Sequence, residues 1–138
     1  MFSVLSSIHW LSVFLAFIAY FTLGPLWFVF LFPKQYSAAL GKVADPSQKV
    51  GPIFIIGPMV CTLIVTLSSA VLLSALHLAS VYDALQFAVV LGLGILCANT
   101  FNIAINPNIP RPLYYGLIVG SYHIVGFSIA TFILVLMQ

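Results

Sequence analysis

Residues 112–137, PLYYGLIVGSYHIVGFSIATFILVLM, decide the fold class of this chain because they contain no Asp, Glu, Lys or Arg. The hydrocarbon core of a bilayer is about 30 Å thick, so a helix that rises 1.5 Å per residue needs roughly 20 apolar residues to cross it. A backbone surrounded by lipid must also satisfy its own hydrogen bonds, which an α-helix does within one segment. We therefore predict that this stretch is a transmembrane helix.

Three further apolar runs have a similar length and character, at about residues 8–32, 52–76 and 83–105. Hydrophobic residues make up 63% of the 138-residue chain and charged residues 4%, a balance that would leave a water-soluble protein with too much exposed apolar surface. A transmembrane barrel would instead show short alternating strands. The sequence predicts an all-α fold, an integral membrane four-helix bundle that forms one domain over residues 1–138.

Basic side chains are confined to two predicted loops, residues 33–51 and 106–112, as Lys34, Lys42, Lys49 and Arg111. With four spans these loops lie on one side of the membrane, and the positive-inside rule makes that side the cytoplasmic one. Both termini are then expected on the non-cytoplasmic side. Trp10 and Trp27, near the two ends of the first span, and Arg111 are expected to be anchors at the membrane interfaces.

The sequence carries none of the motifs of familiar soluble enzymes, such as HExxH, GxSxG or a glycine-rich phosphate loop. Its two acidic residues, Asp45 and Asp83, fall on opposite sides of the membrane, which excludes catalysis by a carboxylate pair. Asp83 has a structural explanation, because Ser80 and Asp83 have the spacing of a capping box. We expect no enzymatic activity, no catalytic or metal site and no nucleic-acid partner.

One ionisable side chain, His123, lies in the middle of the fourth span. Counted at 1.5 Å per residue from the basic end, it is roughly 16 Å deep, and Thr22 and Thr62 reach about 15 Å in the first two spans. These hydroxyls, or a nearby tyrosine, are candidate hydrogen-bond partners for a neutral imidazole. Gly116 and Gly120 share a helix face with His123, and small residues there permit close packing against a neighbouring helix.

Three roles are open for His123. The first is to pin helices together, and this role is favoured. The second is a proton relay or ligand contact, because ionisable groups inside membranes are functional candidates by default. The third is to bind haem or a metal, which requires a second histidine at similar depth. His9 and His77 both lie near the opposite membrane face.

A second polar group is expected nearer the basic loops. Asn99, Asn102 and Asn106 recur at helical spacing on the third span and predict one polar stripe. Tyr115 and Tyr122, seven residues apart on the fourth span, are expected to face this stripe across the short turn. The amides and the tyrosines would then form a polar seam with His123.

The first two spans each carry a Gly-Pro pair at a similar level. Gly24-Pro25 and Gly57-Pro58 lie roughly 9 to 12 Å from the basic face. Proline removes a backbone donor and frees the carbonyl four residues back, so both helices are expected to kink. Kinked helices and amides at one level either enclose a small polar cavity, as broken helices do in transporters, or hold the helices together.

The chain contains, in this order, HWLSVFLAFIAYFTLGPLWF, KQYSAALG, RPL and SYHIVGF. In order and spacing these segments resemble the bacterial membrane family catalogued as domain of unknown function 1761. The resemblance spans nearly the whole chain and implies a four-helix integral membrane protein of no established activity, in the bacterial inner membrane. The family pattern positions that it carries over are Trp10, Gly24, Trp27, Leu40, Gly41, Arg111, Tyr122 and His123. The turn at residues 106–110 departs from the more acidic or glycine-containing turn expected before RPL.

Three function classes follow from these features. The favoured one is a small non-enzymatic bundle that forms a homo-oligomer or assembles with a larger membrane complex. The alternative is an oligomeric binding or passage protein for a small solute or proton, which would use Asn99, Asn102 and His123; four helices alone rarely enclose a pathway. The third class is a haem or metal protein. We expect bound membrane lipid and no other cofactor.

Overall fold

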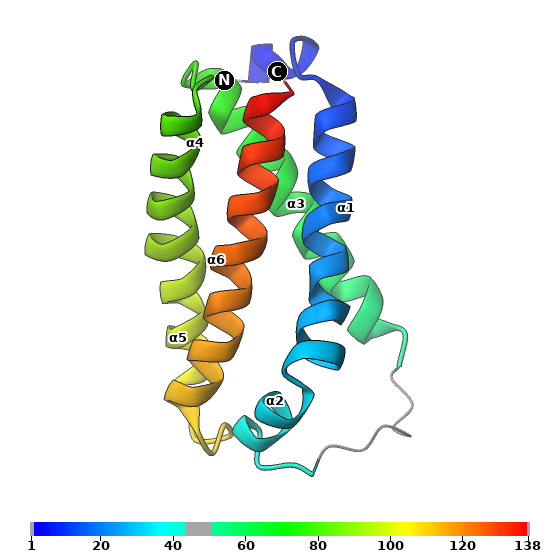
Figure 1. Cartoon of the computed structure of the whole chain (residues 1–138), viewed down its shortest axis with the longest axis vertical. Helices are drawn as coiled ribbons and strands as arrows, with labels where there is room; N and C mark the ends of the chain where they lie inside the picture. Colours follow the sequence, from blue (N-terminus) through cyan, green and yellow to red (C-terminus); the bar gives the residue numbers. More distant parts are fainter. Residues whose placement is uncertain (1, 44–50, 138) are drawn as a thin grey trace.

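Four long helices run side by side in the computed structural model, which describes residues 2–43 and 51–137 (Figure 1). The elements, in chain order, are the 3₁₀ turn η1 (Phe2–Ser6), α1 (Trp10–Pro25), the π-helical η2 (Leu26–Leu31), α2 (Pro33–Ala39), α3 (Ile53–Ala75), α4 (Val81–Phe87), the π-helical η3 (Ala88–Cys97), α5 (Ala98–Ala104) and α6 (Pro112–Leu136). The described residues include no strand. The predicted all-α fold is confirmed.

The helices join into four candidate spans, with a mean hydropathy between 1.9 and 2.2: Trp10–Leu31, Ile53–Ala75, Val81–Ala104 and Pro112–Leu136. The predicted ranges differ from these spans by two residues or fewer at every end. The four helices are long and apolar enough to cross a membrane, which indicates an integral membrane protein. Asp45 and Lys49, both in the predicted first loop, lie outside the described residues.

The fourth span, α6, is the central helix of the bundle. It packs against α1, α2, α4, η3 and α5, and half of its most apolar window is buried, compared with 17% for the first span. Figure 1 shows α6 between α1 on one side and the α4–α5 column on the other. Side chains of α6 therefore meet different neighbours at different heights.

Three glycines of α6 bring its neighbours close. A Cβ atom at Gly116 would lie 2.5 Å from the Phe101 ring, and one at Gly120 would lie 2.7 Å from the Cys97 sulfur. A Cβ at Gly126 would collide with the Tyr20 ring of α1. The close approach expected at Gly116 and Gly120 therefore occurs, but against the third span.

The two Gly-Pro pairs behave differently. Pro25 ends α1, and the π-helical η2 follows it directly. In contrast, α3 is α-helical through Gly57 and Pro58. Pro58 lies near the start of α3, so the carbonyl that it frees belongs to the exposed first turn. Of the two Gly-Pro pairs, the one in the first span directly precedes an irregular stretch, and η3 is a further irregular stretch that the sequence did not indicate.

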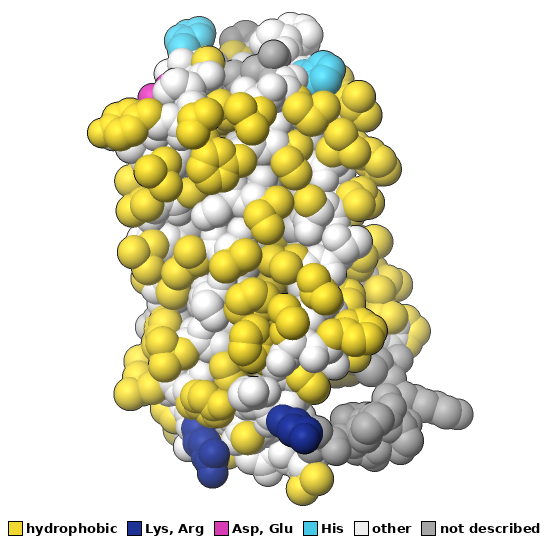
Figure 2. Space-filling view, in the orientation of Figure 1, with side chains coloured by type: hydrophobic (Ala, Val, Ile, Leu, Met, Phe, Trp, Pro, Cys, Tyr) yellow, Lys and Arg dark blue, Asp and Glu magenta, His cyan; other side chains and the backbone are white. Residues whose placement is uncertain are grey.

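The two ends of the bundle differ in charge. Figure 2 shows Lys and Arg side chains at one end, and histidine side chains and the acidic side chain of the described residues at the other. At the basic end Gly41, with a φ of 67°, packs so closely on Pro110 that a Cβ would lie 3.0 Å from the proline Cγ. At the other end the predicted capping box is confirmed, because Ser80 Oγ accepts from the Asp83 N–H and Asp83 Oδ2 accepts from the Ser80 N–H.

Candidate functional site

The first and last spans are joined inside the bundle by a hydrogen bond between two side chains. The Tyr20 hydroxyl of α1 lies 2.8 Å from Nδ1 of His123 on α6, and the two rings meet edge to face. Tyr20 is only 2% exposed, and His123 is half-buried. Because a neutral imidazole accepts at one nitrogen and donates at the other, this bond leaves the ring one further donor or acceptor.

Tyr122, the residue before His123, extends this contact to the second span. Its ring packs on Tyr20, with 5.6 Å between the ring centroids, and its hydroxyl interacts with the Thr62 side chain of α3. A Cβ at Gly24 would lie 3.6 Å from the same hydroxyl, so the glycine leaves room for it. We refer to Tyr20, Thr62, Tyr122 and His123 as the tyrosine–histidine cluster. It connects three of the four spans.

Of the partners expected for His123, the structure selects a tyrosine. Thr22 is exposed, and its hydroxyl donates to the Ile18 carbonyl of its own helix at 2.7 Å. Thr62 is buried, but it meets Tyr122 rather than the imidazole. Depth alone could have indicated Tyr20, because it lies roughly 18 Å from the basic end of its span, close to the depth of His123.

The expected asparagine seam does not form. Asn99 and Asn102 are exposed on the outer side of α5, and no hydrogen-bond partner is found for either amide among the described residues. The side of the third span that meets α6 carries Cys97, Thr100 and Phe101 instead. Each residue turns a helix by about 100°, so neighbours of inward-facing residues can point outward.

The third asparagine of the predicted stripe shapes a turn. The Asn106 side-chain amide donates to the Ile103 carbonyl at 2.6 Å, and its Oδ1 accepts from the Asn108 N–H at 2.8 Å. Side chains of this type commonly close turns at helix ends in this way. Asn106 therefore ends α5 and starts the connection to α6.

Tyr115 lies in a separate aromatic pair nearer the basic end. Its ring is 5.8 Å from that of Tyr36, on the short helix α2. Burial and the neighbouring Tyr115 raise the pKa of Tyr36 to about 12. The pair holds α2 against α6, and the sequence did not single out Tyr36 for this role.

The two tryptophans have different surroundings. Trp10 is 54% exposed at the end of the bundle that carries the termini. Trp27 points to α6, where its indole N–H donates to the Ile118 carbonyl at 3.0 Å, and its ring packs on Phe32. Trp27 therefore fastens helices together in addition to lying near a span end. Arg111 is exposed and directly precedes α6.

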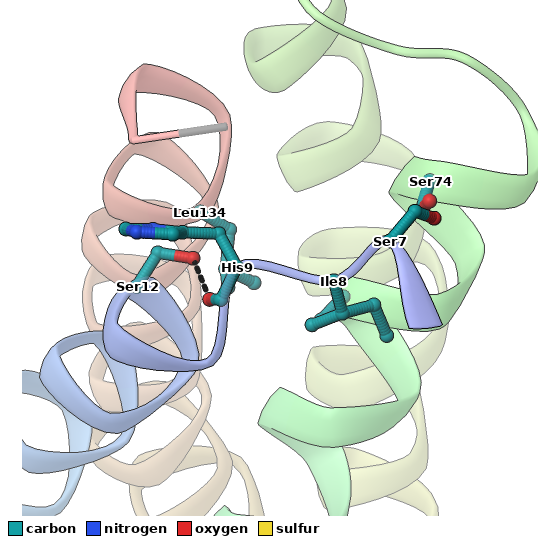
Figure 3. A pocket seen from close by; sticks show the side chains of 7 residues that line it. Ser7, Ile8, His9, Ser12, Ser74 and Leu134 are labelled. Atoms are coloured by element: carbon teal, nitrogen blue, oxygen red, sulfur yellow. Dashed lines mark hydrogen bonds between the residues drawn. The ribbon is translucent and has the colours of Figure 1, made fainter. Parts of the chain in front are cut away.

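Two small cavities lie away from the tyrosine–histidine cluster. One, of about 160 Å³, opens among Ser7, His9, Ser12 and Ser74 at the end that carries the termini, with Ile8, Ala70 and Leu134 also lining it (Figure 3). The other, of about 180 Å³, is lined by Trp27, Phe32, Leu117, Ile118 and Ser121. Within the described residues no three His, Cys, Asp or Glu side chains gather as metal ligands would.

The cluster and the spans that build it lie within a region shared with known sequences. Residues 11–135 match the family model described as protein of unknown function (DUF1761). The chain belongs to the DUF1761 family. The DUF1761 region covers nearly all of the four spans, and Trp10 falls just outside it. No curated protein and no solved structure matches the chain.

Five of the eight pattern positions expected from the DUF1761 resemblance lie at two places in the fold. Gly24, Tyr122 and His123 meet at the tyrosine–histidine cluster. Gly41 and Arg111 lie at the basic end, where Gly41 packs on Pro110 beside Arg111. One group therefore joins spans, and the other joins the two loops at the basic end.

Proposed function

We propose that this protein is a non-enzymatic membrane bundle that works by self-association, with the tyrosine–histidine cluster holding its helices in register. The observation that carries the proposal is the outward position of Asn99 and Asn102 on the third span. Asn99 lies about 8 Å inside the end of that span, where its amide would face lipid in an isolated chain. Polar groups without partners are costly in hydrocarbon, so a protein surface is expected to cover them.

A second copy of the same chain is the occupant that fits this face. An amide both donates and accepts, so the asparagines of two copies can bond to each other. A two-fold axis along the membrane normal places them at the same depth. Gly94 and Ala98 are exposed nearby on the third span, and nothing lies within 4 Å of a Cβ built at Gly94. Small residues on such a face allow two helices to approach closely.

The role given to the cluster also supports this proposal. The hydroxyl of Tyr20 is bonded to His123, and that of Tyr122 interacts with Thr62, so these groups satisfy one another across three helices. Neither of the two cavities described above is lined by these residues. This arrangement suits a contact that fixes helix positions.

The test is the oligomeric state in lipid. Native mass spectrometry from nanodiscs is expected to show dimers or larger oligomers for the wild type. The double change Asn99→Leu/Asn102→Leu is expected to shift the distribution to monomer, whereas Asn108→Leu, which removes an exposed amide in the turn outside the spans, leaves it unchanged. A wild-type protein that is monomeric at every lipid-to-protein ratio would rule out self-association.

The membrane orientation belongs to the same proposal. Lys34 in α2 and Arg111 at the start of α6 lie at the end of the bundle opposite the termini (Figure 1). The positive-inside rule assigns that end to the cytoplasm, with both termini opposite, in a bacterial inner membrane. Thiol labelling of single cysteines introduced at Val43 and Leu76 in intact cells tests the assignment. The expected result is labelling from outside at Leu76 only, and the reverse pattern would overturn it.

A second candidate function is the passage or binding of a proton or small solute. It is favoured by the buried serine and threonine side chains of the described residues, which are Ser12, Thr62, Thr66, Ser69, Thr100 and Thr131. The Thr131 hydroxyl is fully buried and has no hydrogen-bond partner among residues 2–43 and 51–137, which leaves one site that a bound water or solute would satisfy. Proton flux into liposomes that is lost in Thr131→Val but kept in Thr22→Val would support this function over self-association alone.

A further inference from the structure

A cleft on the flank of the bundle lies between the end of the first span and α6. Trp27 and Phe32 form one wall, and Leu117, Ile118 and Ser121 form the other. The cavity measures about 180 Å³, and the indole of Trp27 bridges its walls by donating to the Ile118 carbonyl at 3.0 Å. The two walls of the cleft are therefore joined by a hydrogen bond, and the cleft opens at the surface of the bundle.

The polar atoms of the cleft are already engaged. The Ser121 hydroxyl donates to the Leu117 carbonyl at 2.6 Å and lies 3.1 Å from that of Ile118, which also accepts from Trp27. Neither side-chain donor of the cleft, the indole N–H or the hydroxyl, is free for a polar ligand. The remaining surface is aromatic and aliphatic, so the occupant that fits is an apolar chain.

Basic side chains lie just beyond one end of the cleft. Lys34 follows Phe32 by two residues, and Arg111 precedes Leu117 by six, which is about 9 Å along a helix. Both side chains are exposed, and the packing of Gly41 on Pro110 keeps the two loops together. Within the described residues the acidic side chain, Asp83, lies in the first turn of α4, at the opposite end of the bundle (Figure 1). We call Lys34 and Arg111 the basic rim.

We propose that this cleft is a binding site for one anionic phospholipid, with an acyl chain against Trp27 and Leu117 and the phosphate at the basic rim. Anionic headgroups are attracted to Lys and Arg side chains at the membrane surface, and tryptophan is well suited to the level just below the headgroups. The apolar cleft and the positive rim complement the two parts of one such lipid. The proposal does not depend on self-association.

Native mass spectrometry with defined lipids tests the site. The full-length protein in detergent is titrated with phosphatidylglycerol or phosphatidylcholine of the same acyl length. The wild type is expected to retain one phosphatidylglycerol per chain with a preference of roughly fivefold for each basic side chain of the rim. Lys34→Gln and Arg111→Gln are each expected to lower that preference and to leave binding of phosphatidylcholine unchanged.

A cleft-filling variant separates this site from lipid bound anywhere on the surface. Leu117 is 61% exposed, so Leu117→Trp fills the cleft without disturbing the core and is expected to abolish retention of the single lipid. Ile129→Trp, on the exposed side of α6 away from the cleft, is the matched control and retains it. Unchanged thermal unfolding shows that each variant is folded. Equal retention of the two lipids by the wild type, or normal retention by Leu117→Trp, would overturn the proposal.

Discussion

The inner tyrosine–histidine cluster and the outer Asn99/Asn102 pair are two polar groups within the spans that have opposite surroundings. Tyr20 and His123 bond to each other inside the bundle, whereas the amides face outward and have no hydrogen-bond partner within the described residues. Polar side chains within a bilayer need partners in either place. Under the proposed self-association, the cluster acts within one chain and the amides act between chains.

The largest effect is expected from Gly126→Ala, because the added Cβ would collide with the Tyr20 ring at the centre of the inner group. Overpacking a tight contact of this kind costs typically 1 to 3 kcal/mol, and we expect about 3 kcal/mol here because a ring must move. Thermal or denaturant unfolding in detergent measures the loss. Gly57→Ala is the control, since a Cβ there meets nothing within 4 Å, and equal effects at the two glycines would contradict this packing.

Tyr20→Phe is expected to have the next largest effect, since it removes the hydroxyl and leaves His123 Nδ1 without this partner. Loss of one partner of a buried pair costs about 1 to 2 kcal/mol, and inter-helix bonds in membranes lie at the lower end of that range. Asn99→Ala changes an outward amide and should alter the unfolding free energy of the monomer by less than about 0.5 kcal/mol. If the two changes destabilise the monomer equally, the distinction between inner and outer groups fails.

The side chains of Tyr36 and Tyr115 are less buried than Tyr20 in the inner cluster and less exposed than the two asparagines. We expect this pair to have a smaller effect on the free energy of unfolding, and only at high pH. The pKa of Tyr36 is about 12 in the fold, against 10.0 for an unperturbed tyrosine. Between pH 10 and 12 the unfolded chain therefore loses a proton that the folded chain keeps, so stability falls as the pH rises. Tyr36→Phe should flatten this part of the stability curve, measured by unfolding from pH 8 to 12. An unchanged slope would show that Tyr36 does not contribute.

The sequence could predict how far along its helix each polar side chain lies, but not whether that side chain faces the interior of the bundle or its outer surface. Counting residues placed Thr22, Thr62 and His123 at similar depths, and of these Thr62 and His123 belong to the cluster, whereas Thr22 bonds to its own helix. Tyr122 was expected to face the asparagine stripe, but its hydroxyl meets Thr62. The same count placed Asn99 and Asn102 beside Tyr115, yet both amides point outward. The asparagines point outward because Cys97 and Phe101 of the third span fill the space beside the α6 glycines Gly116 and Gly120.

Features that depend on one segment of the chain were predicted correctly from the sequence. Features that depend on contact between two helices were predicted less well. The capping box of Ser80 and Asp83 needs only its own helix end, and it formed as predicted. From the sequence Trp27 was predicted to be an anchor at the membrane interface, but its indole N–H donates a hydrogen bond to the Ile118 carbonyl of α6. The π-helical η3, which was not predicted, also lies at a contact between two helices, because Phe127 of α6 packs closely against its Gly92.

Disulfide cross-linking between copies tests the comparison between the inner and outer groups most directly. In a background that replaces Cys61 and Cys97, Asn99→Cys and Asn102→Cys are oxidised in lipid and compared with Val89→Cys, an exposed apolar position on the same span. A disulfide requires Cβ atoms about 4 Å apart, so only a true contact reacts efficiently. The account predicts cross-linked dimers at position 99 or 102 and none at 89. No cross-link at 99 or 102, or an equal yield at 89, would contradict it.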